Sequence, residues 1–190
     1  MSDHLIYTIG PSGAGKDSVL TWLSQVLSPR NAVHFARRVI DRPALSNAEE
    51  HESLSTADFV AQRDQQEFAL HWSANRHLYG VRNTELEALK CGKWVFVNGS
   101  RGYLESALDQ FPSMVVLHIT APHIVLESRL LARNRESAEQ IAERLSRTAM
   151  FQPPSHCAFL EVQNNSSIEQ AGQSALHLLS RLPGWVQADL

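Results

Sequence analysis

Hydrophobic residues recur along the chain in two patterns. Short apolar runs predict buried strands at Leu5–Ile9, Val33–Arg37, Trp94–Asn98, Met114–Thr120 and, interrupted by one glutamate, Phe159–Val162. Apolar positions at wider, helical spacing predict helices at about 18–26, 56–63, 83–90, 103–109, 123–131, 137–149 and 168–179. Because strands and helices alternate over short connections, the pattern predicts an α/β fold with a parallel sheet flanked by helices.

One long stretch does not fit this alternation. Residues from about 38 to 80 carry weak strand signals and many polar side chains. We interpret them as an inserted region that binds a substrate, within a single domain that covers residues 1–190. At 190 residues the chain is long enough for one well-packed α/β domain, and it contains no internal repeat or low-complexity linker.

The first predicted strand leads directly into Gly10-Pro11-Ser12-Gly13-Ala14-Gly15-Lys16-Asp17-Ser18, which a predicted helix follows. This context is the one that a P-loop requires, so the fold expected is that of a P-loop kinase. The glycines allow a tight turn whose N–H groups converge, and the helix start adds partial positive charge. We therefore expect this segment to bind ATP, with Lys16 reaching the β- and γ-phosphates.

The two residues after the lysine bear on the metal. Ser18 is the candidate ligand for Mg²⁺ or a phosphate, whereas Asp17 either lies near the metal or caps the helix, and the sequence leaves both open. Many P-loop enzymes place an Asp at the end of a later strand to hold Mg²⁺, but Asn98 stands there. The acidic support for the metal must come from elsewhere.

A second cluster of charge lies at residues 129–147. Arg129 and Arg133 are four residues apart and share a helix face, and Arg144 lies on the next predicted helix. One interpretation is a solvated helix pair whose glutamates neutralise the arginines. Downstream of a P-loop we favour another: a short lid at about 132–144, whose Arg133 and Arg144 act as catalytic cations on the transferring phosphoryl group.

Candidates for the second substrate lie in the inserted region. Arg38 and Arg42 belong to a basic run just after a predicted strand and could hold an acceptor phosphate, or could form a plain basic surface. His71 and Tyr79 lie in an aromatic-rich segment that offers polar contacts to a phosphorylated ligand, although the aromatic residues could simply be core. These four residues are the proposed acceptor site.

Two more candidates follow the strand Trp94–Asn98. Ser100 and Arg101 could contact a substrate phosphate, or the serine could cap the following helix. The sequence does not decide between the two. No Ser/His/Asp or Cys/His arrangement has a persuasive signature, and phosphoryl transfer needs no covalent nucleophile on the protein.

Composition and charge limit the kinds of partner that we expect this protein to bind. The net charge of −3 gives no general basic field, so we expect no nucleic-acid partner. The longest apolar runs are too short to cross a membrane, and the chain opens on a strand rather than a signal peptide. The two cysteines and nine histidines lack metal-ligand spacing. We expect a cytoplasmic protein, monomeric or homodimeric, that acts on a small molecule.

These motifs resemble, in order and spacing, the guanylate kinase-like branch of the P-loop kinases over nearly the whole chain. The resemblance implies that the loop binds ATP, that Arg38, Arg42 and Tyr79 hold the acceptor's phosphate, and that Arg133 and Arg144 clamp the transferring group. Guanylate kinases usually carry Phe-Leu-Glu-Trp and Tyr-Gly-Thr or Tyr-Gly-Ser, whose carboxylate and hydroxyl contact guanine.

Here the corresponding runs are Phe68-Ala69-Leu70-His71-Trp72 and Tyr79-Gly80-Val81. Losing hydrogen bonds on which such a site is built changes discrimination by factors of roughly 10⁴–10⁵, which argues against GMP. The chain is similar instead to the ribose 1,5-bisphosphate phosphokinases of phosphonate breakdown. That resemblance implies transfer from ATP to the C1 phosphate of the sugar, giving 5-phosphoribosyl 1-diphosphate. A nucleoside monophosphate kinase and a non-catalytic interaction module are the alternatives.

Overall fold

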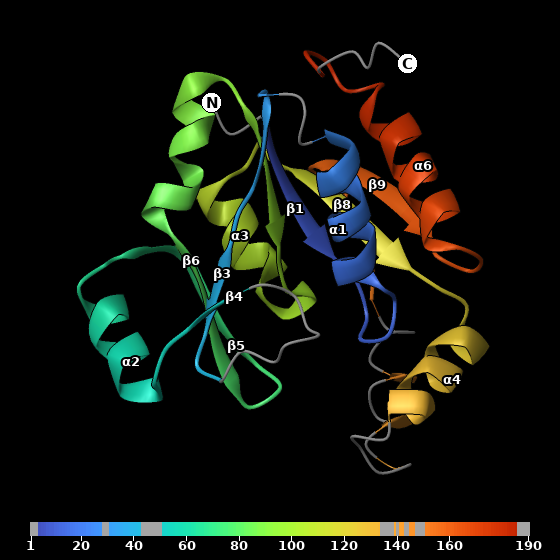
Figure 1. Ribbon diagram of the computed structural model, residues 1–190, viewed down its shortest axis with the longest axis horizontal. Helices are drawn as coiled ribbons and strands as arrows, with labels where there is room; N and C mark the ends of the chain where they lie inside the picture. Colours follow the sequence, from blue (N-terminus) through green and yellow to red (C-terminus); the bar gives the residue numbers. More distant parts are fainter. Residues whose placement is uncertain are drawn as a thin grey trace. The chain divides into compact units, whose positions relative to one another are not determined.

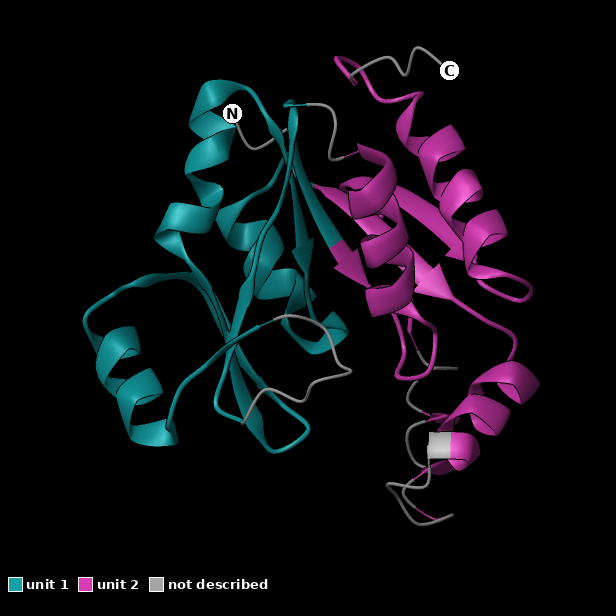
Figure 2. Ribbon diagram, viewed as in Figure 1, with its two compact units in different colours: residues 1–7, 30–114 teal, residues 8–29, 115–190 magenta. Residues whose placement is uncertain are grey.

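The computed structural model describes residues 4–27, 31–42, 51–133, 139, 141–142, 145–146 and 151–185. The chain forms two compact units, one of residues 1–7 and 30–114 and one of residues 8–29 and 115–190 (Figure 2). Strand β1 (Leu5–Ile9) belongs in part to each. Among the described residues no helix combines the length and the hydrophobicity needed to cross a membrane.

The first unit contains most of the strands (Figure 1). Besides the start of β1, its elements are β2 (Val33–Phe35), β3 (Arg38–Ile40), β4 (His51–Ser53), α2 (Thr56–Asp64), β5 (Phe68–Ala74), β6 (His77–Arg82), the 3₁₀ helix η2 (Asn83–Cys91), β7 (Trp94–Asn98), the 3₁₀ turn η3 (Arg101–Tyr103) and α3 (Leu104–Gln110). The second unit contains α1 (Lys16–Leu27), β8 (Val115–Thr120), α4 (His123–Arg133), β9 (Ala158–Gln163) and α6 (Ile168–Leu179).

The predicted parallel sheet is confirmed. β2 pairs in parallel with β7, and β8 pairs in parallel with β9, in a five-stranded sheet of order β2-β7-β1-β8-β9. All five residues of β1 and of β7 are buried, which is why both strands appear in the sequence as continuous apolar runs with correctly predicted ends. The weaker strand predicted at Phe159–Val162 is β9, which is one residue longer at each end.

Two sequence predictions need correction, and a third is only partly described by the structure. Val33–Arg37 does not form one strand: β2 ends at Phe35, and the chain enters a new strand at Arg38. The helix predicted at 83–90 is a 3₁₀ helix that ends at Gly92, whose φ of 72° is left-handed. The helix predicted at 137–149 falls mostly outside the described residues, although positions 139, 141–142 and 145–146 are helical.

The weak strand signals at 38–80 conceal a second sheet, of order β4-β3-β6-β5. β3 and β6 are antiparallel, as are β5 and β6, while β3 and β4 are parallel. One face packs against α2 through Val39, Phe59 and Phe68, with the two phenylalanine rings stacked at 4.6 Å. Two of the strands have only three residues, which is too short for a period to show in the sequence.

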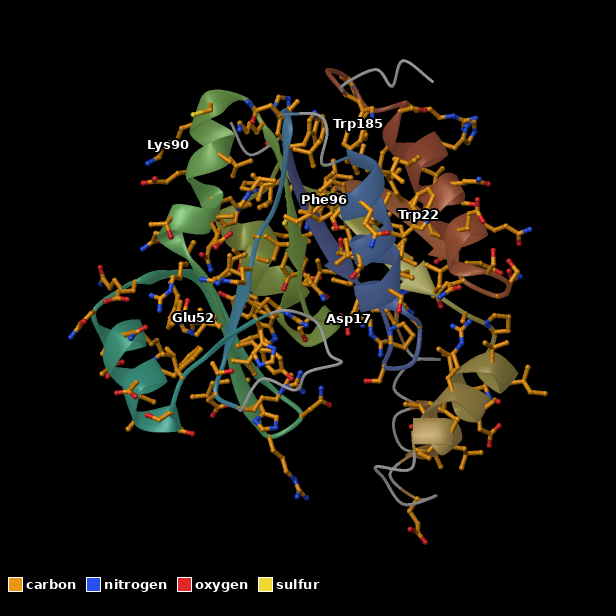
Figure 3. The ribbon with its side chains drawn as sticks, viewed as in Figure 1. Asp17, Trp22, Glu52, Lys90, Phe96 and Trp185 are labelled. Carbon is orange, nitrogen blue, oxygen red and sulfur yellow. The ribbon has the colours of Figure 1, made fainter. Side chains whose placement is uncertain are left out.

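In the second unit, α1 and α6 lie side by side, and Trp22 of α1 lies between them (Figures 1 and 3). Gly172 of α6 faces this ring so closely that a Cβ would overlap it. An alanine would normally favour a helix interior by about 1 kcal/mol over glycine. Here the indole occupies the space, so the glycine is required by packing.

We predict that Gly172→Ala destabilises the protein by about 1–3 kcal/mol, because overpacking outweighs the gain in helix propensity. Gln173→Ala, on the exposed side of the same helix, is the matched control and should change stability by less than about 0.5 kcal/mol. Urea unfolding followed by tryptophan fluorescence measures both. A stabilised Gly172→Ala variant would show that the helices can move apart without cost.

A second prediction concerns Glu52 of β4, labelled in Figure 3, which binds the guanidinium of Arg82 with an Oε2–Nε distance of 2.9 Å. Hydrogen bonds from Arg82 lower the pKa of Glu52, despite the opposing effect of burial. A carboxyl whose folded pKa is depressed stabilises the fold above its unfolded pKa of about 4.3 and loses that contribution as pH falls through the folded pKa.

Glu52→Gln should therefore cost about 1–3 kcal/mol at pH 7, and the difference from wild type should shrink as the pH falls below about 4.3. Glu87→Gln is the control, because its carboxylate lies 4.0 Å from Lys90 and both side chains are largely exposed. Urea midpoints across pH measure both variants. A difference that does not vary with pH would contradict the assigned ion pair.

Candidate functional site

The predicted P-loop connects β1 to α1 in the second unit. Its glycines take conformations and positions that other residues could not: φ is 87° at Gly13 and 82° at Gly15. A Cβ at Gly10 would overlap the carbonyl of Ile119, and one at Gly15 would overlap the amide of Asn164. The turn is therefore set by packing against the end of β8 and the segment after β9.

Three side chains hold the carbonyl groups of this loop. Lys16 Nζ donates to the carbonyls of Gly10 and Pro11, at 2.9 and 3.2 Å. Arg129 of α4 donates to Gly13 at 3.3 Å, and the buried Asn164 amide donates to Ala14 at 2.8 Å. Since the N–H and C=O of one peptide point in opposite directions, these contacts turn loop N–H groups the other way, which is the arrangement that binds phosphate.

A cavity of about 260 Å³ lies beside the loop, lined by Gly13, Gly15, Ser18, Arg129, Ala132, Asn164 and Ile168. It is smaller than the roughly 300–1,000 Å³ that encloses a whole drug-sized ligand, so it suits one part of a larger molecule. Asn164 is completely buried, and its Oδ1 has no hydrogen-bond partner among the described residues. That acceptor, beside a guanidinium and apolar walls, suits a flat ring that carries a donor group.

The proposed metal ligand Ser18 is exposed in the first turn of α1, next to the exposed Asp17 (Figure 3). Within the described residues, no group of three or more His, Cys, Asp or Glu side chains could form a metal site.

The structure describes only one of the two predicted lid arginines. Arg133 is the last residue of α4, and Arg144 lies outside the described residues. The arginine that contacts the loop is Arg129, one turn earlier on α4. Sequence analysis named Arg129 but did not choose it, and it missed Asn164 altogether. An asparagine just beyond a predicted strand end was the available signal.

The acceptor candidates lie in the first unit, on the second sheet. Strand pairing places Arg38 and Tyr79 on one face, since Arg38 pairs with Val81 two residues along β6. The guanidinium of Arg38 lies over the Tyr79 ring, with 5.5 Å from Cζ to the ring centre, and donates to the carbonyl of Asn98 at 3.4 Å. Trp72 pairs with Tyr79, and their rings stack at 5.6 Å. We call this side of the sheet the Tyr79 face.

His71 does not join this group. It pairs with Gly80, so its side chain points to the opposite face, where it is exposed. The alternation of Leu70, His71 and Trp72 already indicated that the histidine and the tryptophan face opposite sides. The motif comparison considered only the order of the residues and not the face on which each lies. The side chain that lies beside Tyr79 is Trp72.

The end of β7 supplies the other candidates. Ser100 caps η3, because its hydroxyl accepts from the N–H of Gly102 at 3.3 Å, so the capping interpretation describes this structure. Its backbone N–H donates to the Tyr7 hydroxyl at 3.0 Å. Burial raises the pKa of Tyr7 well above its usual range, which keeps the phenol neutral. Arg101, the first residue of η3, is half-buried.

An unpredicted network organises the turn after β3. Asp41 accepts from the N–H of Leu78 at 2.8 Å, from the Thr56 hydroxyl at 3.0 Å and from His77 Nδ1 at 3.1 Å. Burial alone would raise the pKa of Asp41, but these hydrogen bonds hold it below its usual range. The carboxylate thereby fixes the start of the segment that carries Arg42.

No protein-family model matches the chain. It is 39% identical over 183 residues to ribose 1,5-bisphosphate phosphokinase PhnN of Burkholderia pseudomallei, covering 95% of this chain and 97% of that protein. It is 40% identical to the protein of the same name from Yersinia pestis, covering 93% and 91%. Other relatives are longer: the chain spans 42% of the Laribacter hongkongensis protein of this name and 24% of a bifunctional ribose 1,5-bisphosphokinase-thymidine phosphorylase of Azorhizobium caulinodans.

Two solved structures share the fold. A guanylate kinase from Anaplasma phagocytophilum superposes with a TM-score of 0.62 at 16% identity, covering 92% of this chain and 83% of that one. An unliganded sugar kinase from Janibacter gives 0.52 at 16% identity, covering 97% and 98%. Identities this low show the fold alone, and the predicted P-loop kinase fold is confirmed. The full-length similarity to the Burkholderia and Yersinia proteins shows more: the chain belongs to the ribose 1,5-bisphosphate phosphokinase family.

Proposed function

We propose that this protein transfers the γ-phosphoryl group of ATP to the C1 phosphate of ribose 1,5-bisphosphate, giving 5-phosphoribosyl 1-diphosphate and ADP in phosphonate breakdown. The observation that carries the proposal is a P-loop in which four carbonyls, those of Gly10, Pro11, Gly13 and Ala14, are held by Lys16, Arg129 and Asn164, in a member of this family. An interaction module has no need of so complete a phosphate site.

ATP would bind in the second unit. The loop residues Gly10 to Ser18 would surround its phosphates, Lys16 would supply positive charge at the β- and γ-positions, and the cavity beside Asn164 would take the adenine ring, whose amino group is a donor. Ser18 would be a ligand of Mg²⁺, which would supply positive charge to neutralise the phosphates. Arg133 and Arg144, within a lid at about 132–144, would stabilise the transferring group's oxygens.

The acceptor would bind to the first unit, in the predicted substrate region of residues 38–80. Arg38, Arg42 and Tyr79 would hold a phosphate, and Arg101 would supply a further positive charge. His71 is left out of the acceptor site because it lies on the opposite face of the sheet. Ser100 would contribute by capping η3. A phosphate acceptor is already ionised at neutral pH and attacks as its own nucleophile, so no general base is required. We infer that both units act as one guanylate kinase-like domain, in a cytoplasmic monomer or homodimer.

The Tyr79 face also argues for a sugar rather than a base. Besides Tyr79 itself, the β5 and β6 residues on it are Leu70, Trp72, Ala74, His77 and Val81. None of these five offers the carboxylate or hydroxyl with which guanylate kinases read guanine, and Trp72 is buried against the rings of Tyr79 and Tyr103. A nucleoside monophosphate kinase is therefore the weaker candidate.

The direct test is ADP release with Mg-ATP and either ribose 1,5-bisphosphate, GMP, AMP or dTMP as acceptor. We expect turnover with the sugar bisphosphate and at least 10²-fold lower kcat/KM with each nucleotide. Preference for a nucleotide would overturn the proposal in favour of a nucleoside monophosphate kinase.

Lys16→Ala should lower kcat by about 10²–10³-fold, the usual cost of removing one preorganised charge from a transition state. Lys90→Ala is the matched control, since Lys90 is exposed at the end of η2 (Figure 3). Single-turnover ADP formation distinguishes chemistry from product release. Unchanged kcat in Lys16→Ala would remove the loop from the catalytic role.

Arg42→Ala should raise the KM for the sugar bisphosphate by about tenfold to a hundredfold while leaving the KM for ATP nearly unchanged, because a charge-assisted hydrogen bond contributes about 1.5–3 kcal/mol. Arg63→Ala is the control: the guanidinium of Arg63 pairs with the neighbouring Asp64 at 2.8 Å. Steady-state kinetics with each substrate varied in turn give both constants. Equal increases in both KM values would contradict a role confined to the acceptor.

A further inference from the structure

A buried histidine on β4 has no part in the function proposed so far. His51 is 7% exposed and pairs with Arg38 across the parallel strands β4 and β3. Paired residues on adjacent strands project from the same face, so His51 lies on the Tyr79 face. The next residue, Glu52, projects to the opposite face, where it binds Arg82.

Two cationic groups among the described residues act on this imidazole. Arg38 faces it from β3 and Arg42 from the turn after β3, and the ring also donates a hydrogen bond to the backbone carbonyl of Arg42. Burial first, and then repulsion from Arg42 and Arg38, lower the pKa of His51. In the free protein both effects favour the neutral ring over the protonated one.

Arg42 provides independent evidence that this place is built for an anion. Its Nε is buried and has no hydrogen-bond partner among the described residues. A buried donor without an acceptor destabilises a protein, because the hydrogen bond that it made to water is lost. A phosphate oxygen would supply the missing acceptor, and its charge would offset two guanidinium groups and an imidazole at once.

We propose that His51 binds the acceptor's phosphate together with Arg38 and Arg42, and that it takes up one proton from solvent when the acceptor binds. The inference rests on the proposed function and adds a residue to its acceptor site. One ring nitrogen keeps its hydrogen bond to the Arg42 carbonyl, and the other gains the proton and donates to a phosphate oxygen. No bond to phosphorus changes in this step.

The physical reason is the change of sign in the surroundings of the ring. Two cations disfavour the protonated imidazole in the free protein, whereas a phosphate dianion between them favours it. Binding and protonation are thus linked, and the acceptor's affinity must fall as pH rises, by at most about tenfold per unit for one proton. Histidine is the residue suited to this, because its charge changes in the physiological range.

The test measures binding without turnover. Ribose 1,5-bisphosphate is titrated calorimetrically into the protein at pH 7.5, without ATP, in two buffers of different ionisation enthalpy. A phosphate ester with its second pKa near 6 is then almost fully dianionic and contributes few protons itself. We expect net proton uptake by wild type, its loss in His51→Gln, and its retention in His177→Gln, which alters an exposed histidine of α6.

The pH dependence gives a second criterion. The dissociation constant of wild type should be up to about tenfold below that of His51→Gln at pH 7, and the two should converge at pH 8.5, where the wild-type ring is also neutral. If His51→Gln does not fold, the ¹⁵N shifts of the wild-type histidines, with and without ligand, report the same protonation. Uptake that persists in His51→Gln, or shifts that show a neutral ring in the complex, would overturn the proposal.

A parallel titration with GMP separates the two levels of inference. If GMP alone binds, with uptake that depends on His51, the role of His51 stands and the proposed substrate fails. If the sugar bisphosphate binds and uptake does not depend on His51, the substrate stands and the role of His51 fails. If neither compound binds, both are wrong.

Discussion

A backbone loop binds phosphate only if its carbonyl groups are held away from the ligand. In this protein that task falls to Lys16, Arg129 and the Asn164 amide, which come from the first turn of α1, from α4 and from the segment after β9. The close approach of Gly10 to β8 and of Gly15 to Asn164 leaves no room for a side chain. Elements of the second unit thus supply the side chains that hold the loop carbonyls. The buried asparagine contributes to the shape of the loop, as the glycines do.

The first unit also gathers groups suited to binding an anion, but it does so with side chains on a sheet instead of a backbone loop. Its second sheet divides its two faces by function: one packs apolar side chains against α2, while the other gathers Arg38, His51, Tyr79 and Trp72. Cations on that face are supported by aromatic rings and neutral carbonyls, as in the contact of Arg38 with Tyr79 and Asn98. Two carboxylates of this part of the chain are engaged with other groups: Glu52 binds Arg82, and Asp41 accepts from Thr56 and His77.

The same contrast explains how a guanylate kinase-like fold could serve a substrate without a base. Val81 is completely buried, and Trp72 stacks on Tyr79, so these strand neighbours of the proposed phosphate ligand Tyr79 are apolar or aromatic. They offer little to a purine's donors and acceptors. Under the proposed function, discrimination against nucleotides would follow from the absence of these hydrogen bonds.

Sequence alone determined the parts that depend on local chemistry. The glycine-rich loop with Lys16 was recognisable because its turn needs residues without side chains at particular positions, and β1 and β7 because strands buried on both faces are continuously apolar. Tertiary structure decided which side chains meet. His71 was separated from Tyr79 by the pleat of β5, and Ser100 was committed to a cap. Asn164, Asp41 and His51 gained their roles from chain segments far away in sequence. Strand register and packing bring such groups together, and neither can be inferred from the spacing of residues along one segment.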